Sequence, residues 1–393
     1  MKKIDIIQFL PYFPPHKGGL EDVAEWMASA YVQAGYGEVL NVVFSVGQEE
    51  MITSPLTPLL GGDGDIIGYE RDGYKVVILP AFDLVKNFPF PAFWRREFWD
   101  AFREVRKFDA QIIQTHTRFF LSSLIGGIYA KRHRKKWVHI EHGSGYVVSD
   151  KWMVAFFSKL FDRTIGLWIL RSADSIIAIS EACKRFVQSE FADRDISVIY
   201  RGMDILDIPR VPSIDGKVRI AFVGRLVHLK GVRYLLEALK SFDDAGIDNI
   251  SCRIVGDGEE RGELETFVQD NKLESSVAFL GFLSKNEILS DILPTTDIFV
   301  NPSLQEGLPT TVIEALLSKC MVVATDVGGT REISDKEDLI IVSPEDSNVL
   351  YDGMKEALLS YKEVSGSSYA SVRERFDSGK NIGRMYEVYG GIV

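Results

Sequence analysis

Two glutamates separated by seven residues stand where an apolar run passes through a loop into a helix. Glu306 lies in the predicted loop and Glu314 within the predicted helix. The start of a helix has free backbone N–H groups and a positive dipole end, which suit an anion such as a diphosphate. Gly307 allows close backbone approach, and Pro309 fixes the turn into the helix. The stretch therefore predicts an anion-binding helix start that also carries two carboxylates.

A second stretch carries positive charge. Arg225 and Lys230 lie in the loop Gly-Arg-Leu-Val-His-Leu-Lys-Gly, which directly follows a predicted buried strand at residues 218–223. In open α/β sheets, ligands bind beyond the carboxyl ends of the strands. A guanidinium and an ammonium at that position can together neutralise a diphosphate leaving group.

Two histidines are candidates for the active site. His142 stands just past a predicted strand at residues 137–141, and His116 ends the preceding strand at residues 111–115. Strand alternation places His139 and Glu141 on one face and His142 on the other, which does not decide between the candidates. We prefer His142 because it follows the strand end directly, with His116 as the competing candidate.

A glycine pair opens the first predicted helix. Gly18 and Gly19 follow the first strand, and glycines there expose N–H groups at a helix start. The pair lacks a full G-x-G-x-x-G pattern, so it does not by itself predict a dinucleotide site.

Together these stretches resemble the retaining glycosyltransferases of family 4, which have the two-domain GT-B fold. The glutamates match the family's E-x7-E signature, and residues 224–231 match its G-R-L-x-x-x-K-G pattern. The resemblance implies that Glu306 contacts hydroxyls of the donor sugar and that Glu314 contacts the ribose. It also implies that Arg225 and Lys230 hold the donor phosphates and that His142 lies near the donor sugar.

The resemblance extends over nearly the whole chain. Gly18 and Gly19 resemble the family's first glycine loop, and Phe282 lies at a strand end that matches the surroundings of the nucleotide base. Arg201 stands where the family's N-G-x-D turn usually has asparagine, which leaves the role of that position open. The implied donor site comprises Gly18, Gly19, Arg225, Lys230, Phe282, Glu306, Gly307, Leu308, Pro309, Thr310 and Glu314. The implied catalytic residues are His142, Glu306, Arg225 and Lys230.

Alternating short apolar runs and helical patterns predict an α/β fold with two Rossmann-like domains, whose parallel sheets face each other across a cleft. The predicted domains are residues 1–210, on the acceptor side, and residues 211–377, which bind the donor. A last helix at about residues 378–393 is expected to cross back to the first domain. The predicted strands are residues 4–9, 39–44, 75–79, 111–115, 137–141, 175–180, 218–223, 251–255, 277–280, 297–300, 321–324 and 339–342. Residues 48–64 are expected to form an irregular loop.

Composition limits the possible functions. Forty-five Lys and Arg stand against 56 Asp and Glu, and the net charge of -11 argues against general nucleic-acid binding. The three cysteines are far apart, which fits neither a disulfide framework nor a zinc site and suggests a reducing, cytoplasmic location. The apolar stretch at residues 152–170 contains Lys159, Asp162 and Arg163, so we do not expect it to span a membrane.

A surface feature remains outside the donor site. Residues 131–136 read Lys-Arg-His-Arg-Lys-Lys, and residues 88–96 and 152–170 are rich in aromatic side chains. Basic and aromatic side chains suit an anionic membrane surface or a lipid-linked acceptor, although a solvated helix end beside a core helix explains the same pattern.

The sequence thus predicts a retaining transferase that moves a sugar from a UDP- or GDP-sugar to the hydroxyl of a sugar or lipid-linked acceptor. It would act in glycan or glycolipid biosynthesis, with peripheral membrane association possible. We expect no metal and no further cofactor, because no D-x-D stands at a convincing strand end. One alternative is a UDP-sugar 2-epimerase of the GT-B fold, and another is a non-catalytic sugar-binding protein. An NAD oxidoreductase is disfavoured because the dinucleotide fingerprint is missing.

Overall fold

The computed structural model describes residues 2–14, 18–45, 57–60, 66–85, 88–147, 152–203, 208–214 and 216–393. The chain divides into two compact units. Unit 1 comprises Met1–Met203 and Phe376–Val393, and unit 2 comprises Asp204–Arg375. The boundaries predicted from the sequence were residues 210 and 377.

Unit 1 is built on one sheet with the strand order β10-β9-β8-β7-β1-β2-β5-β4-β3, and β6 pairs with β5. Its strands are β1 (Ile6–Leu10), β2 (Val39–Ser45), β3 (Thr57–Leu60), β4 (Ile66–Arg71), β5 (Tyr74–Val85), β6 (Phe88–Pro91), β7 (Ile112–His116), β8 (Lys136–Glu141), β9 (Ser175–Ala178) and β10 (Ser197–Val198). Its helices are α1 (Gly19–Gln33), α2 (Arg96–Lys107), α3 (Leu121–His133), α4 (Trp152–Phe161), α5 (Leu167–Ser172), α6 (Glu181–Glu190) and α13 (Ser378–Gly390), and a π-helical turn at Asp162–Gly166 joins α4 to α5. Strand order reverses between β1 and β7, which makes their carboxyl ends the expected ligand-binding edge.

Unit 2 has a fully parallel sheet with the order β13-β12-β11-β14-β15-β16. Its strands are β11 (Val218–Val223), β12 (Ile250–Val255), β13 (Val277–Gly281), β14 (Ile298–Asn301), β15 (Met321–Thr325) and β16 (Leu339–Val342). Its helices are α7 (Val232–Asp244), α8 (Arg261–Asp270), α9 (Lys285–Glu287), α10 (Thr310–Leu317), α11 (Ser347–Val364) and α12 (Tyr369–Arg375). Numbered within the unit, this order is the 3-2-1-4-5-6 arrangement of a Rossmann sheet, with its reversal between β11 and β14.

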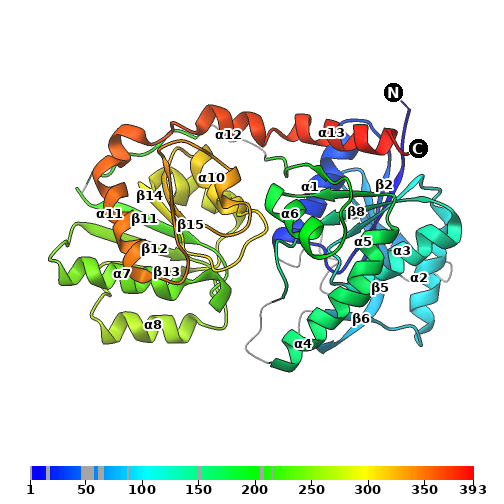
Figure 1. The fold of residues 1–393 in the computed structure, drawn as a ribbon, viewed down its shortest axis with the longest axis horizontal. Helices are drawn as coiled ribbons and strands as arrows, with labels where there is room; N and C mark the ends of the chain where they lie inside the picture. The colour runs from blue at the N-terminus through cyan, green and yellow to red at the C-terminus, as the bar shows by residue number, and fades with distance from the viewer. Residues whose placement is uncertain are drawn as a thin grey trace. The chain divides into compact units, whose positions relative to one another are not determined.

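The core of unit 2 lies between its sheet and two packed helices. Alternating strand residues such as Ile220 and Phe222 meet Leu235 from α7 and Met354 from α11, and all four are fully buried. Figure 1 shows α11 (orange) beside α7 (green), and the two helices contact each other. Each Å² of apolar surface that is buried stabilises the fold by about 25 cal/mol, and this burial holds the strand ends in place.

The C-terminal helix belongs to unit 1. Figure 1 shows α13 (red) against α1 (blue), and the two helices are in contact. The Trp26 indole N–H donates to the Ser378 hydroxyl at 2.7 Å, and the Tyr386 ring stacks on Tyr36 with centroids 4.4 Å apart. Residues more than 350 positions apart in the chain therefore share one fold.

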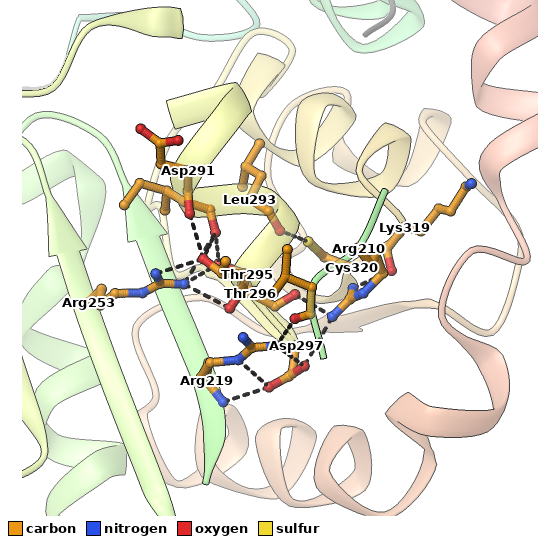
Figure 2. A network of polar contacts seen from close by, with 12 residues as sticks. Arg210, Arg219, Arg253, Asp291, Leu293, Thr295, Thr296, Asp297, Lys319 and Cys320 are labelled. Carbon is orange, nitrogen blue, oxygen red and sulfur yellow. Dashed lines mark hydrogen bonds and ion pairs between the residues drawn. The ribbon is translucent and has the colours of Figure 1, made fainter. Parts of the chain in front are cut away.

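A buried polar network anchors the start of unit 2 (Figure 2). Asp297, just before β14, accepts hydrogen bonds from Arg210 at 3.1 Å and from the Arg219 side chain at 3.1 Å. Arg253 of β12 donates to the Thr295 and Thr296 hydroxyls at 2.8 and 3.0 Å. The network lies at the amino ends of the strands, opposite the ligand-binding edge, and its role is to hold the entering chain.

All twelve predicted strands are present, with ends that shift by a few residues. The short strands β3, β4 and β6 were missed because they extend the sheet in antiparallel fashion outside the regular alternation, and the two-residue strand β10 was not predicted either. The prediction of an irregular loop over residues 48–64 is wrong at Thr57–Leu60, which forms β3. Residues 48–56 and 61–64 lie outside the described part of the chain.

Candidate active site

In unit 2, two loops meet where the strand order reverses. Residues 224–231 follow β11 and residues 302–309 follow β14. The Leu304 N–H donates to the Leu229 carbonyl at 2.8 Å, which ties the loops together. Gly231 has φ 63°, and a Cβ there would collide with the carbonyl oxygen of Pro302. Only glycine satisfies both the left-handed backbone and the close approach.

Lys230 and Glu306, the predicted cation and the first predicted carboxylate, form an ion pair between these two loops. The Lys230 ammonium donates to Glu306 Oε1 at 2.5 Å, and the Ser303 hydroxyl donates to the same oxygen at 2.7 Å. On its other side, the loop is held by the Gly329 N–H, which donates to the Gly307 carbonyl at 2.9 Å. Charge-assisted hydrogen bonds of this kind are about twice as strong as neutral ones and fix the carboxylate's orientation.

Ser303 links Glu306 to the end of β14. Its hydroxyl lies 3.0 Å from Asn301 Oδ1, and among the described residues the buried Asn301 Nδ2 has no hydrogen-bond partner. Exchanging the oxygen and nitrogen of this amide lets Asn301 donate to Ser303, while Ser303 donates to Glu306. The exchange gives the Asn301 Nδ2 group an acceptor and makes a directed chain from the strand to the carboxylate.

The second carboxylate has a different lysine. Glu314, on α10, lies 3.8 Å from the Lys285 ammonium. Lys285 begins α9, three residues after Phe282, whose side chain is exposed beyond the end of β13. Each glutamate therefore has its own cation and its own strand-end loop, so the two can serve different parts of a ligand.

Arg225 adds a second positive charge to the first of these loops. Its side chain is exposed, and Leu226 beside it is fully buried. Gly256, after β12, has φ 131°, and a Cβ there would collide with the carbonyl oxygen of Gly224. The loops after β11 and β12 therefore pack closely, which holds Arg225 at the strand end.

In unit 1 the two candidate histidines contact each other. His116 Nδ1 and His142 Nε2 lie 3.0 Å apart. His116 is fully buried, whereas His142 is partly exposed at the end of β8. Burial lowers the pKa of His142 to about 4, and burial together with His142 and His139 holds the pKa of His116 well below its ordinary value. Both rings are neutral at pH 7, so His142 offers a hydrogen-bonding imidazole and not a cation.

A chain of buried amides stands behind His116. His116 Nε2 lies 2.9 Å from Gln8 Oε1 and 2.7 Å from Gln114 Nε2. The Tyr389 hydroxyl, from α13, donates to Gln114 Oε1. Because a buried polar group without a partner is costly, this chain restricts which nitrogen of His142 carries the proton.

Beside His142, a buried arginine joins two carboxylates. Arg118 Nη1 lies 3.0 Å from Glu141 Oε1, and Nη2 lies 3.2 Å from Asp162 Oδ2. Burial opposes ionisation of Glu141, but Arg118, His139 and the Gly143 N–H outweigh it and hold the pKa of Glu141 well below its ordinary value. Burial raises the pKa of Asp162 to about 6 despite Arg118. The cluster fixes the backbone on which His142 stands.

The glycine pair of unit 1 lies at the start of α1. Gly18 is extended at φ 177°, and Gly19 is the first helical residue. Arg201 is buried nearby in contact with the same helix, with Nη1 3.8 Å from Asp22. His16 and Lys17, which precede the glycines, lie outside the described residues.

Comparison with known proteins gives this geometry a family. Residues 18–205 match the model of Glycosyltransferase Family 4, and residues 217–360 match that of Glycosyl transferases group 1. An uncharacterized glycosyltransferase of Methanocaldococcus jannaschii is 30% identical over 345 residues, which cover 85% of this chain and 83% of the relative. The chain belongs to the group 1 glycosyltransferases of family 4.

Solved structures agree with this assignment. A sucrose-phosphate synthase from Thermosynechococcus elongatus superposes with a TM-score of 0.78 at 20% identity, covering 99% of each chain. The Anabaena protein HepE, in complex with UDP and glucose, superposes with a TM-score of 0.75 at 18% identity, covering 99% of this chain and 100% of that one. These identities show the fold alone, and that fold is GT-B. The family membership makes this glycosyltransferase an enzyme of the class predicted from its sequence.

Most of the predicted residues of this glycosyltransferase cluster within their own unit. The structure brings Lys230 and Glu306 together and places Gly307, Leu308, Pro309 and Thr310 between Glu306 and the start of α10. Leu308 and Pro309 are buried, so their role is to shape the loop. The roles assigned toward a ligand to all of these residues, and to Gly18, Gly19, Arg225, Phe282, Glu314 and His142, stay predictions.

Several residues of the site were missed from the sequence. They share one property: each is a polar residue in or beside a strand that otherwise reads as buried. They are Gln8, Gln114, Arg118, Glu141 and Ser303. Because buried polar groups need partners, such residues signal a network, although the sequence does not name the partner.

Proposed function

We propose that this glycosyltransferase is a retaining enzyme that moves a sugar from a nucleoside diphosphate sugar to an acceptor hydroxyl. The observation that supports the proposal is the cluster of Lys230, Glu306 and Ser303 at the point where the unit 2 sheet reverses its order. One ammonium has three N–H donors, so Lys230 can contact Glu306 and a phosphate oxygen at once.

Most of the reaction is assigned to residues of unit 2. Arg225 and Lys230 neutralise the negative charge that develops on the diphosphate as its bond to the sugar carbon breaks. Glu306 accepts hydrogen bonds from sugar hydroxyls beside that carbon, and Glu314 accepts them from the ribose. The acceptor oxygen bonds to the same face of the carbon, and its proton passes to the departing phosphate oxygen. His142 of unit 1 takes part as a neutral hydrogen-bonding group.

The donor is a UDP- or GDP-sugar and the acceptor a sugar or lipid-linked hydroxyl in glycan or glycolipid synthesis. The complex of HepE with UDP and glucose supports a nucleotide-sugar donor. We also propose that the charge-neutralising role of Arg225 and Lys230 replaces a metal ion. Among the described residues, no helix is both long and apolar enough to cross a bilayer. Peripheral association with a membrane is part of the proposal.

A donor screen tests the proposal. Thermal shift with UDP-, GDP- and ADP-sugars identifies the donor, because a ligand that binds only the folded protein raises its melting temperature. NMR of the product then reports whether the configuration at the sugar carbon is kept. Arg225→Ala and Lys230→Ala should each lower turnover by roughly a hundredfold. Transfer that stops in EDTA, or a product of inverted configuration, would contradict the mechanism.

A further inference from the structure

Helix α4 turns its apolar side chains outward. Trp152, Phe156 and Phe157 are 76%, 58% and 61% exposed, and Ser158 is the residue that α4 buries. A helix on the surface of a water-soluble domain normally shows the reverse pattern, with the apolar stripe facing the core. An outward apolar surface of this kind marks an interaction site.

The exposed surface continues beyond α4. Rings connect it to the strand β6: Phe161 lies 6.1 Å from Phe88, and Phe88 lies 5.1 Å from Phe90. The contacts run on through Phe82 to Trp94, with the last two centroids 4.9 Å apart. Figure 1 shows α4 beside β6. We call the exposed side chains of Trp94, Trp152, Met153, Phe156, Phe157 and Leu160 the aromatic face.

The exposed charges on the helical segment that carries most of this surface have one sign. From α4 to α5 the helix runs on without leaving the helical region, and its exposed ionisable residues are Lys159, Arg163 and Arg171. The one acid of this segment, Asp162, is buried against Arg118. On a chain with a net charge of -11, an apolar helix surface whose own exposed charges are all cationic indicates a negatively charged partner.

We propose that the aromatic face sits in the interface of an anionic lipid bilayer. Trp, Phe and Leu side chains occupy the boundary between headgroups and acyl chains, while Lys and Arg beside them contact lipid phosphates. A second copy of the chain is a poor partner, because it would bring the same cationic helical segment against itself.

The inference deepens the proposed function, on which its consequence for the acceptor rests. Arg118 joins Asp162, directly after α4, to Glu141, directly before His142. The membrane-bound helix is thus connected through one buried cluster to the ligand-binding edge of unit 1. This connection holds that edge at the bilayer surface, which favours an acceptor hydroxyl carried by a lipid.

The basic run at residues 131–136 is a separate surface. It ends α3 and begins β8, whereas α4 comes after the end of β8. Lys135 is paired with Asp109 at 2.6 Å, and the Lys131 ammonium lies over the Trp137 ring. Since the two surfaces lie at opposite ends of β8, charge reversal in the run is a control and not the main test.

The experiment measures partition of the full chain onto vesicles of phosphatidylcholine with and without phosphatidylglycerol. We expect binding only with the anionic lipid, and release by salt. Phe156→Ser with Phe157→Ser should lower partition by roughly tenfold for each side chain. Lys159→Glu should lower it by at least about fivefold. Leu359→Ser removes an even more exposed apolar side chain from α11 of unit 2 and should leave binding unchanged.

Quenching of tryptophan fluorescence by brominated lipid gives an independent readout. Trp152→Phe should remove much of the quenching, whereas Trp99→Phe should not. Equal binding to neutral vesicles, unchanged binding of the Phe156 and Phe157 variant, or loss of binding only on reversal of Arg132 and Arg134 would each overturn the proposal. So would sedimentation that shows a dimer dependent on Phe156. These variants should still hydrolyse the donor when no vesicles are present. A wild-type protein that does not hydrolyse any donor would instead count against the proposed function.

Discussion

Ser303→Ala tests how the orientation of Glu306 affects catalysis without changing the charge of Glu306. The hydroxyl of Ser303 donates to Glu306 Oε1 at 2.7 Å, and the substitution removes this bond but keeps the ion pair with Lys230. A hydrogen bond to a charged group contributes about 1.5–3 kcal/mol, which corresponds to a loss of roughly 10- to 150-fold if the bond matters fully in the transition state. We expect the lower part of this range, because Lys230 still holds the same oxygen.

The effect should fall on turnover. Glu306 is assigned to the sugar beside the reacting carbon, so kcat should fall while the affinity for the nucleoside diphosphate, measured by titration calorimetry, stays within about twofold. Ser334→Ala is a matched control, since Ser334 is another buried serine of unit 2 that hydrogen-bonds to Ser368, away from the loops. Its kcat should be unchanged even if its melting temperature drops.

A double-mutant cycle decides whether Ser303 acts through Glu306. In a Glu306→Gln background, Ser303→Ala should cost much less than it does alone, because the charged acceptor has already been removed. Additive losses would refute the reasoning. A Ser303→Ala enzyme with full kcat, or with diphosphate affinity reduced as much as kcat, would refute it too.

Three further predictions concern the carboxylates, the buried cluster and acid stability. Glu306→Gln should mainly lower kcat and sugar discrimination, whereas Glu314→Gln should mainly weaken binding of the free nucleoside diphosphate; calorimetry beside initial rates checks this, and the opposite outcome would reverse the assignment. Arg118→Met removes the guanidinium that pairs with two buried carboxylates and should lower the free energy of unfolding by about 3–5 kcal/mol in urea titration, whereas the exposed Arg171→Met should change little. The pKa of His142 is lowered in the folded state from 6.5 to about 4, so below pH 6.5 the unfolded state binds more protons and stability is lost as the pH falls toward 4, by up to about 3 kcal/mol. His142→Asn should therefore lose less stability than wild type between pH 7 and acid conditions; the raised pKa of Asp162 acts in the opposite direction but is present in both proteins.

Short-range sequence patterns predicted much of the fold. Apolar runs such as residues 218–223 and 321–324 predicted strands correctly, because a strand buried on both faces needs nearly continuous apolar side chains. The loops after these strands were placed correctly for the same reason. Once the strands were predicted, the motifs of unit 2 could be placed at their carboxyl ends, where ligands bind in a parallel sheet.

Contacts between distant residues could not be predicted in this way. Lys230 and Glu306 are 76 positions apart, and Tyr389 reaches Gln114 across 275 positions. Alternation along β8 left His116 and His142 as competing candidates, and the structure instead makes them hydrogen-bonding neighbours. Such contacts depend on the order of the strands in the sheet. A local sequence pattern shows that a segment is a strand but not which strands are its neighbours.

The sequence by itself determined which segments are strands, which loops carry charge and which family the motifs resemble. Only the tertiary structure decided which residues face inward. The apolar stretch beginning at Trp152 is compatible with a core helix or a surface helix, and the burial of Ser158 with Trp152, Phe156 and Phe157 exposed selects the second orientation. The physical reason is that hydrophobicity is a property of a residue, whereas burial is a property of everything packed around it.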